Sequence, residues 1–370
     1  MIYTVSEISG EKGWHDFLAM PSEIYRDDPN WIAPQVSETR RLLDAGKNPY
    51  FMGAVLKLFV CYCDNKPVSR SILVINHRHW ERWNKKPAFF GFFESVNDML
   101  ASKTLFEKIE AESRSLGAEY LEGPFNPNHY SELGILVNNF GIPPIFFETY
   151  NPPYYSQLLA EAGFYELCRF HTRLNDDMPS LLAKIQSAKT KGVIDKDIVI
   201  RRFRLGSMKK ELEIMREINN DAFEGNWYFL PLTREEYLFS AKFMFLVTTP
   251  RLVLFAEYKG QPAGLLQCVV NFNRLIKPYR GNIAPWHLPA LFMKRKSLKE
   301  LVIFTVGIKK AFQHTGVSSA LVNSALEIFK KYDSVSTTWI SDENKAVIHV
   351  AELFGMKPFK YFSIYSKSLK

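Results

Sequence analysis

The sequence is poor in cysteine, with four in 370 residues, and it contains no long uninterrupted apolar run. Cys61, Cys63, Cys168 and Cys268 are not accompanied by a second Cys or His pair at zinc-ligand spacing, so we expect no structural metal. A membrane span needs about 18 consecutive apolar residues, and a secretory signal needs a basic start before an apolar run. The sequence shows neither pattern, so we expect a cytoplasmic protein without a transmembrane segment.

The composition is that of a globular protein, because hydrophobic residues make up 46% and charged residues 23% of the chain. A length of 370 residues favours two domains. The net charge of +8 favours an anionic partner, which a nucleotide, a nucleic acid or an acidic membrane surface would each supply. Solvated surface lysines are the alternative explanation of this charge.

Strand and helix patterns follow the same order in the two halves: strand, two helices, two strands, strand, helix, strand, helix, strand. The halves share no residue-level repeat, so we predict two copies of one α/β unit that have diverged. The predicted boundaries are a first domain over residues 1–174, a linker over 175–197 and a second domain over 198–370. Within the linker, SLLAKIQSAKTKG indicates a helix or a basic segment.

A glycine-containing turn, QHTGVS at residues 313–318, follows the expected strand ELVIFTVGI and opens the expected helix SSALVNSALEIF. The first turn of a helix has unpaired N–H groups and a positive dipole end, and glycine allows a ligand to approach the backbone closely. Successive amides in such a turn form an anion nest. The pattern predicts an anion site here, with a simple turn before a helix as the alternative.

This turn resembles the [R/Q]-x-x-G-x-[G/A] motif of the GNAT superfamily of acyl-coenzyme A dependent N-acyltransferases, with Ser318 departing at its last position. The segment NKAVIHVAELFGM resembles the last helix of that family, with Asn344 and Gly355 at the family's interval. Ala351 stands where many relatives have a tyrosine that protonates the leaving thiolate, and Met356 replaces a phenylalanine. The family's usual acid is therefore missing.

The resemblance implies tandem GNAT-like folds of the α/β class, each a mixed, mostly antiparallel sheet flanked by helices. The first half resembles the family in element order only, because VNDMLASKT before its helix has no glycine. We therefore predict that only the second half binds the cofactor. Other stretches, such as GPFNPNHYSELGILV, resemble two-domain GNAT-like bacterial proteins of largely unassigned substrate.

The resemblance further implies acetyl-coenzyme A or another acyl-coenzyme A as cosubstrate. The residues expected to hold this cosubstrate are Val306, Ile308, Gln313, His314, Thr315, Gly316, Val317, Ser318, Ser319 and Asn344. Asn226 and Trp227 fall in the loop that borders the acceptor site in this superfamily, although a Trp buried under the loop is equally compatible. Asn344 has an alternative role as the first residue of its helix.

Transfer to an amine needs a base that acts directly or through water, and Asp342, Glu257 and Asp221 are the candidates. Asp342 follows an expected strand at the carboxyl end, where open α/β sheets bind ligands. Its alternative role is to cap the next helix.

We therefore predict an acyl-coenzyme A dependent N-acyltransferase that acts on a small-molecule or lipid-like amine. One alternative is amide synthesis from aminoacyl-tRNA, and another is a non-catalytic acyl-coenzyme A binding protein. HRHWERWNKK at residues 77–86 interleaves basic and aromatic residues, but a solvated hairpin or loop is preferred over a nucleic-acid contact. APWHLPALFMKRK at 284–296 places apolar residues beside a basic cluster that could touch lipid or a long acyl chain.

Overall fold

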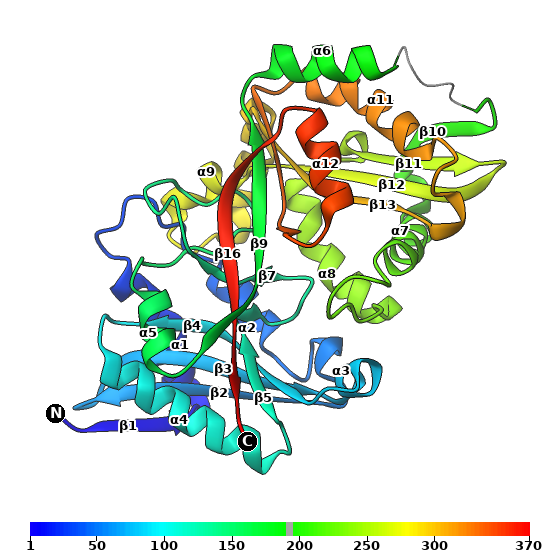
Figure 1. Ribbon diagram of the computed structural model, residues 1–370. Coiled ribbons are helices and arrows are strands. Elements are labelled where there is room, and N and C mark those ends of the chain that lie inside the picture. Colours follow the sequence, from blue (N-terminus) through cyan, green and yellow to red (C-terminus); the bar gives the residue numbers. More distant parts are fainter. Residues whose placement is uncertain (190–194) are drawn as a thin grey trace. The chain divides into compact units, whose positions relative to one another are not determined.

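The computed structural model describes residues 1–189 and 195–370, which form two compact units (Figure 1). The first unit comprises 1–170, 276–283 and 360–370, and the second comprises 171–275 and 284–359. The predicted second domain, 198–370, therefore extends beyond the end of the second unit at residue 359. The reason is that residues 365–368 pair with the strand 120–123 of the first unit.

The first unit is built on a sheet in which β1, β2, β3, β4, β5 and β16 are neighbours in that order. All the pairs with a printed register are antiparallel except β4 with β5, which are parallel. Its elements are β1 (Tyr3–Glu7), α1 (Gly10–Ile24), α2 (Val36–Leu42), β2 (Ala54–Cys63), β3 (Lys66–Asn76), α3 (His77–Trp83), β4 (Pro87–Ser95), α4 (Met99–Ser115), β5 (Tyr120–Gly123), β6 (Phe125–Asn126), β7 (Glu132–Leu133), β8 (Ile135–Leu136) and α5 (Tyr155–Glu161). The strands β9 (Tyr165–Asn175) and β16 (Lys357–Ser368) run from one unit into the other.

Helices cover both faces of this sheet. Since the side chains of a strand point alternately to the two faces, one strand can pack against a helix on each side. Leu73 and Ile75 of β3 share a buried cluster with Leu105 and Phe106 of α4. Arg70, on the opposite face of β3, places its guanidinium 4.5 Å from the ring centroid of Phe17 in α1. The segment 77–86, expected as a hairpin or loop, instead begins with helix α3, whose His79 is buried.

A buried ion pair fastens the start of the 360–370 segment within the first unit. Lys360 and Glu148 are separated by 3.2 Å, and their side chains are 0% and 2% exposed. Lys360 Nζ also donates to the carbonyls of Ile142 and Pro143, each at 2.9 Å. The ammonium thus has three acceptors, which compensates much of the cost of its burial.

We expect Lys360→Met to lower the free energy of unfolding by about 3–5 kcal/mol, because the Glu148 carboxylate then stays buried without its partner. The double variant Lys360→Met/Glu148→Gln removes that charge and should recover part of the loss. Urea denaturation followed by circular dichroism measures both variants. If Lys360→Met is at least as stable as the double variant, the unpaired Glu148 carboxylate is not the cause of the loss.

The second unit has the same design, with β9, β14, β13, β12, β11 and β10 as neighbours in that order. Only β13 and β14 are parallel among its pairs with a printed register. Its other elements are α6 (Met178–Lys189), β10 (Ile198–Arg202), α7 (Met208–Ala222), α8 (Arg234–Val247), β11 (Val253–Tyr258), β12 (Gln261–Val270), α9 (Asn273–Ile276), α10 (Leu288–Lys294), β13 (Glu300–Ile308), α11 (Val317–Phe329), β14 (Ser334–Thr337), β15 (Ile340–Ser341) and α12 (Lys345–Leu353). The prediction of two α/β units with mixed, mostly antiparallel sheets is confirmed.

Figure 1 shows α11 on one face of β11–β13 and α7 on the other. Much of the predicted linker is helix α6, which packs against α11. Leu181 and Ile185 lie one turn apart in α6, and each is 1% exposed, so this helix belongs to the core of the second unit. Residues 190–194 of that linker lie outside the described residues. Among the described helices, none is long and apolar enough to cross a membrane.

Candidate functional site

The central feature of the second unit is the point where the parallel strands β13 and β14 separate. They pair only from Glu300↔Ser334 to Ile303↔Thr337, while β13 continues beside β12 as far as Ile308. The register with β12 shifts between Gln267 and Cys268, which makes Phe304 an extra residue in β13. Such a bulge bends a strand and increases its twist. Beyond it, β13 has an edge that β14 does not cover.

This uncovered edge carries the two strand residues predicted to contact the cofactor. Val306 is 44% exposed, and Ile308 is partly buried. Thr338 closes the narrow end of the opening. Its N–H donates to the Ile303 carbonyl at 3.1 Å, and its hydroxyl donates to the Phe304 carbonyl at 3.0 Å. The strand edge from Thr305 onward therefore lies beyond the last bond of this ladder, available to an extended ligand with amide groups.

The turn that was predicted to form an anion nest follows β13 and precedes α11. His314 and Gly316 both have positive φ, at 66° and 87°, and Gln313 is extended. Gly316 is the N-cap residue of α11, and no side chain caps this helix end. A turn with two left-handed residues therefore precedes the uncapped first turn of α11, and an uncapped helix start of this kind suits an anion. The structure brings all seven predicted turn residues, 313–319, into this one corner.

Two contacts fix the position of the nest. Gly264 of β12 lies against the first turn of α11, because a Cβ on it would lie 2.9 Å from Val317 Cγ1 and 3.1 Å from Leu321 Cδ1. On the other side, Asp221 Oδ1 accepts a hydrogen bond from the Lys310 N–H at 2.6 Å. Asp221 was predicted as a catalytic base, but this bond commits one of its oxygens to holding the turn.

Asp342 lies in the loop that leads from β15, which pairs with β9, to α12. Its Oδ1 is 2.6 Å from Nδ1 of His171, and its side chain is 43% exposed. The alternative role as a helix cap does not apply, because Asn344 caps α12 and accepts from the Val347 N–H at 3.2 Å. Asp342 thus combines a fixed position with an exposed carboxylate, as a base for an incoming amine requires.

His171 is itself held in one protonation form. Arg173 Nε donates to His171 Nε2 at 3.1 Å, so that nitrogen is an acceptor and the proton resides on Nδ1, facing Asp342. Burial lowers the pKa of His171, although Asp342 acts in the opposite direction. The neutral ring therefore donates to Asp342. Arg173 also donates to Glu352 of α12 at 3.0 Å, and so links this group to α12.

Glu257 has a different environment from Asp342. Arg201 joins it to Glu211, with Nε 2.5 Å from Glu257 and Nη1 2.6 Å from Glu211. Glu257 belongs to β11, which β12 separates from β13. This arrangement favours a structural ion pair between β10, β11 and α7 over a base at the opening.

The predicted acceptor residues lie in the loop after α7. Asn226 is exposed and its backbone forms turn bonds with Phe223 and Phe229, at 2.9 and 3.1 Å. Trp227 is partly buried and stacks on Tyr228, with ring centroids 4.0 Å apart. Both residues stay candidates for substrate contact.

Ala351, which the resemblance places where many relatives have a tyrosine, is 6% exposed on α12. Sequence reasoning did not identify His171 and Arg173, although both occur at alternate positions of an expected strand. Two basic residues that share one face of a buried strand are an available signal, because such side chains are rarely buried without partners.

The corresponding helix end in the first unit, that of α4, is already occupied by a carboxylate. Asp98 Oδ1 accepts from the N–H groups of Leu100 and Ala101 at 2.8 and 3.2 Å, and Tyr3 donates to the same side chain. An internal carboxylate takes the place that an anionic ligand would need and repels its charge. This geometry supports the prediction that the first unit does not bind the cofactor.

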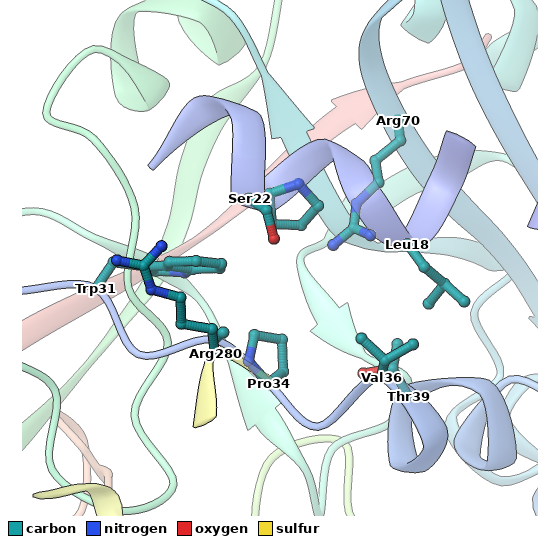
Figure 2. Close-up of a pocket in the computed structure, with 10 residues that line it drawn as sticks. Leu18, Ser22, Trp31, Pro34, Val36, Thr39, Arg70 and Arg280 are labelled. Carbon is teal, nitrogen blue, oxygen red and sulfur yellow. The ribbon is translucent and has the colours of Figure 1, made fainter. Parts of the chain in front are cut away.

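The first unit also contains a small cavity, shown in Figure 2. Arg70, Ser22 and Thr39 line it together with apolar side chains and Arg280. Arg70 is 3% exposed and bonds to the Phe17 carbonyl, so part of its guanidinium is engaged in the fold. None of the predicted site residues lines this cavity, and it is distinct from the opening between β13 and β14.

Comparisons with known proteins match both the fold and this corner. Residues 212–356 match the model of the acetyltransferase (GNAT) family. "Bacterial ceramide synthase" of Caulobacter vibrioides is 28% identical over 365 residues, covering 95% of this chain and 94% of the relative. "Protein YghO" of Escherichia coli is 26% identical, covering 95% and 92%. A tandem GNAT protein from the clavulanic acid biosynthesis pathway aligns with TM-score 0.55 at 11% identity, over 100% of this chain and 99% of that one.

Proposed function

We propose that the chain is a GNAT acyltransferase, which transfers an acyl group from acyl-coenzyme A to an amine and uses its second unit, where residues 212–356 match the family model. The observation that carries this proposal is the uncapped N-terminus of α11 beside the uncovered edge of β13. The nest supplies amides for a pyrophosphate, and the strand edge supplies hydrogen-bonding groups for an amide-containing arm.

In this proposal the backbone around His314–Ser319 holds the pyrophosphate of coenzyme A. The edge of β13 at Val306–Ile308 aligns the pantetheine arm and directs N–H groups toward the thioester carbonyl. Asn344 is already engaged through its side-chain oxygen in capping α12, which leaves its amide nitrogen for a ligand. Each role is carried by backbone or by a fixed side chain.

Asp342 is the proposed base, acting on the amine directly or through a water molecule. His171 is the positioning residue, because its Nδ1–H fixes Oδ1 and leaves the other carboxylate oxygen for the amine. Deprotonation of the amine allows it to attack the thioester carbonyl; the carbon–sulfur bond then breaks and coenzyme A leaves as the thiolate.

The chain offers no tyrosine at the position of Ala351 to protonate that thiolate. A thiol with a pKa near 8.5 is an acceptable leaving group without a dedicated acid. Since general acid catalysis contributes about 10²–10⁴-fold, its loss slows transfer and does not abolish it. Water can deliver the proton after the carbon–sulfur bond has broken.

The acceptor class follows from a relative. Ceramide is the N-acyl amide of a long-chain amino alcohol, and the relative named a ceramide synthase shares 28% of its residues with this chain over nearly its whole length. We therefore propose a lipid-like primary amine as acceptor and a long acyl chain on coenzyme A. The high aromatic share of 14% is compatible with an apolar acceptor surface.

The test is a thiol-release assay with acetyl-coenzyme A and palmitoyl-coenzyme A, each offered with a long-chain amino alcohol and with a short amine of the same head group. We expect coenzyme A release and an amide product for the long-chain pair. If coenzyme A is released only with acetyl-coenzyme A and the short amine, the protein is an acyltransferase, but its acceptor is not lipid-like. Binding of coenzyme A without turnover for any amine would make the protein a binding module.

A further inference from the structure

A surface of the second unit, apart from the proposed catalytic site, combines exposed apolar and basic side chains. It is formed by residues 284–299, which comprise α10 and the turns on either side. Trp286 is 76%, Met293 70% and Phe292 39% exposed, and Lys294 and Lys296 are exposed beside them. We call this the 284–299 surface.

The exposure of these residues is imposed by the fold. Leu291 is 2% exposed and anchors α10, which turns its neighbours Phe292 and Met293 outward. Arg295 donates through Nη1 to the Thr248 carbonyl at 3.1 Å, and its guanidinium lies 5.2 Å from the ring centroid of Phe292. The aromatic and sulfur-containing side chains are thus presented on a fixed support.

The 284–299 segment itself contributes only basic charged side chains, although the exposed Asp333 lies beside Lys299, to whose carbonyl its N–H donates at 2.8 Å. No Asp or Glu occurs between Glu257 and Glu300, so the whole surface is free of acidic residues in its own segment. Lys294, Lys296 and Lys299 are exposed, and none forms an ion pair with another described residue. The surface therefore presents positive charge next to apolar side chains.

We infer that the 284–299 surface docks on an anionic phospholipid bilayer. Trp at the headgroup level, with Phe and Met below it and lysines toward the phosphates, is the arrangement that interfacial segments use. A second copy of this chain is disfavoured as occupant, because its equivalent surface carries the same positive charge. A nucleic acid is the other anionic occupant, because the exposed Trp286 offers a ring on which a base can stack, and it is an outcome of the test below.

This inference does not require the proposed acyl transfer, since docking is measured without any substrate. It would place the second unit at the surface where a lipid-like amine resides. The charged headgroup layer, and not the bilayer interior, is the expected position of α10, because the segment contains two prolines and is too short to span.

The experiment is co-sedimentation of the full chain with sucrose-loaded vesicles of phosphatidylcholine, with and without about one-third phosphatidylglycerol, at physiological salt. We expect binding only to the anionic vesicles, weakening as salt rises. Each lysine near the membrane surface contributes about fivefold to binding. Lys294→Gln/Lys296→Gln should therefore lower the vesicle partition coefficient about 25-fold. Trp286→Ser/Met293→Ser should lower it at least about tenfold.

A matched pair of variants separates this surface from the general positive charge of the chain. Trp286→Ser/Lys294→Gln/Lys296→Gln changes one exposed apolar residue and two lysines here. Leu205→Ser/Lys209→Gln/Lys210→Gln likewise changes one exposed apolar residue and two lysines elsewhere on the unit, where Leu205 is 64% exposed. We expect the first variant to lose vesicle binding and the second to keep it. Unchanged circular dichroism of both verifies folding.

Equal losses in the two triple variants would overturn the inference, as would binding to neutral vesicles that neither variant weakens. The inference would also be wrong if the chain does not bind vesicles but binds a 20-nucleotide single-stranded RNA through these residues. That result would assign the surface to nucleic acid. Concentration-dependent self-association that Trp286→Ser abolishes, without vesicle binding, would instead assign it to a second copy.

Discussion

Gly316→Asp will weaken the binding of coenzyme A by at least about 100-fold in a folded protein. The substitution places a carboxylate at the N-terminus of α11, against the pyrophosphate that the nest is proposed to hold. Two like charges about 4 Å apart near a protein surface repel by about 4 kcal/mol, which exceeds the 2.7 kcal/mol of a 100-fold change. Calorimetric titration of coenzyme A into both proteins measures the difference.

Gly316→Asn is the control for this substitution. Asparagine has the same shape as aspartate, carries no charge and tolerates the left-handed backbone that residue 316 adopts, with φ of 87°. We expect it to retain most of the affinity. Equal affinities for the Asp and Asn variants would show that the turn carries no pyrophosphate.

Asp342→Asn will lower kcat by about 10²–10⁴-fold and leave the affinity for acyl-coenzyme A nearly unchanged. An asparagine oxygen still accepts from His171 Nδ1, so the contact of 2.6 Å and the local fold are preserved while the base is lost. Steady-state kinetics with the amine above saturation and at several pH values measures the effect. Amines already deprotonated at high pH should partly rescue the variant.

Glu257→Gln is the comparison, because Glu257 was an equal candidate from the sequence alone. Its ion pair with Arg201 predicts a small effect on kcat and at most a modest loss of stability. A comparable loss of kcat in both variants would return Glu257 to the catalytic role. No loss in Asp342→Asn would remove Asp342 as the base.

The sequence predicted the glycine turn and its flanking strand and helix closely, because each depends on a local pattern. The strand at 300–308 and the helix starting at Val317 were expected at these positions. The bulge at Phe304 was not, since nothing in the residue pattern distinguishes an extra strand residue from a regular one. The separation of β13 from β14 therefore needed the structure.

The contact between His171 and Asp342 joins residues 171 positions apart, so no periodicity could reveal it. For the same reason the sequence favoured Asp342 only by its place after a strand, and could not show the side-chain partners that distinguish it from Glu257 and Asp221. Strand β16 is a similar case: its residues fit a final strand, but only its pairing with β5 shows that 360–370 belongs to the first unit.

The most direct measurement is the stoichiometry of acyl-coenzyme A binding to the full chain by calorimetric titration. We expect one site per chain, which is lost in Gly316→Asp. Asp98→Asn should not affect it, because Asp98 lies at a helix end of the first unit, outside the proposed site. Two sites per chain, or one site that survives Gly316→Asp, would contradict a single coenzyme A site in the second unit.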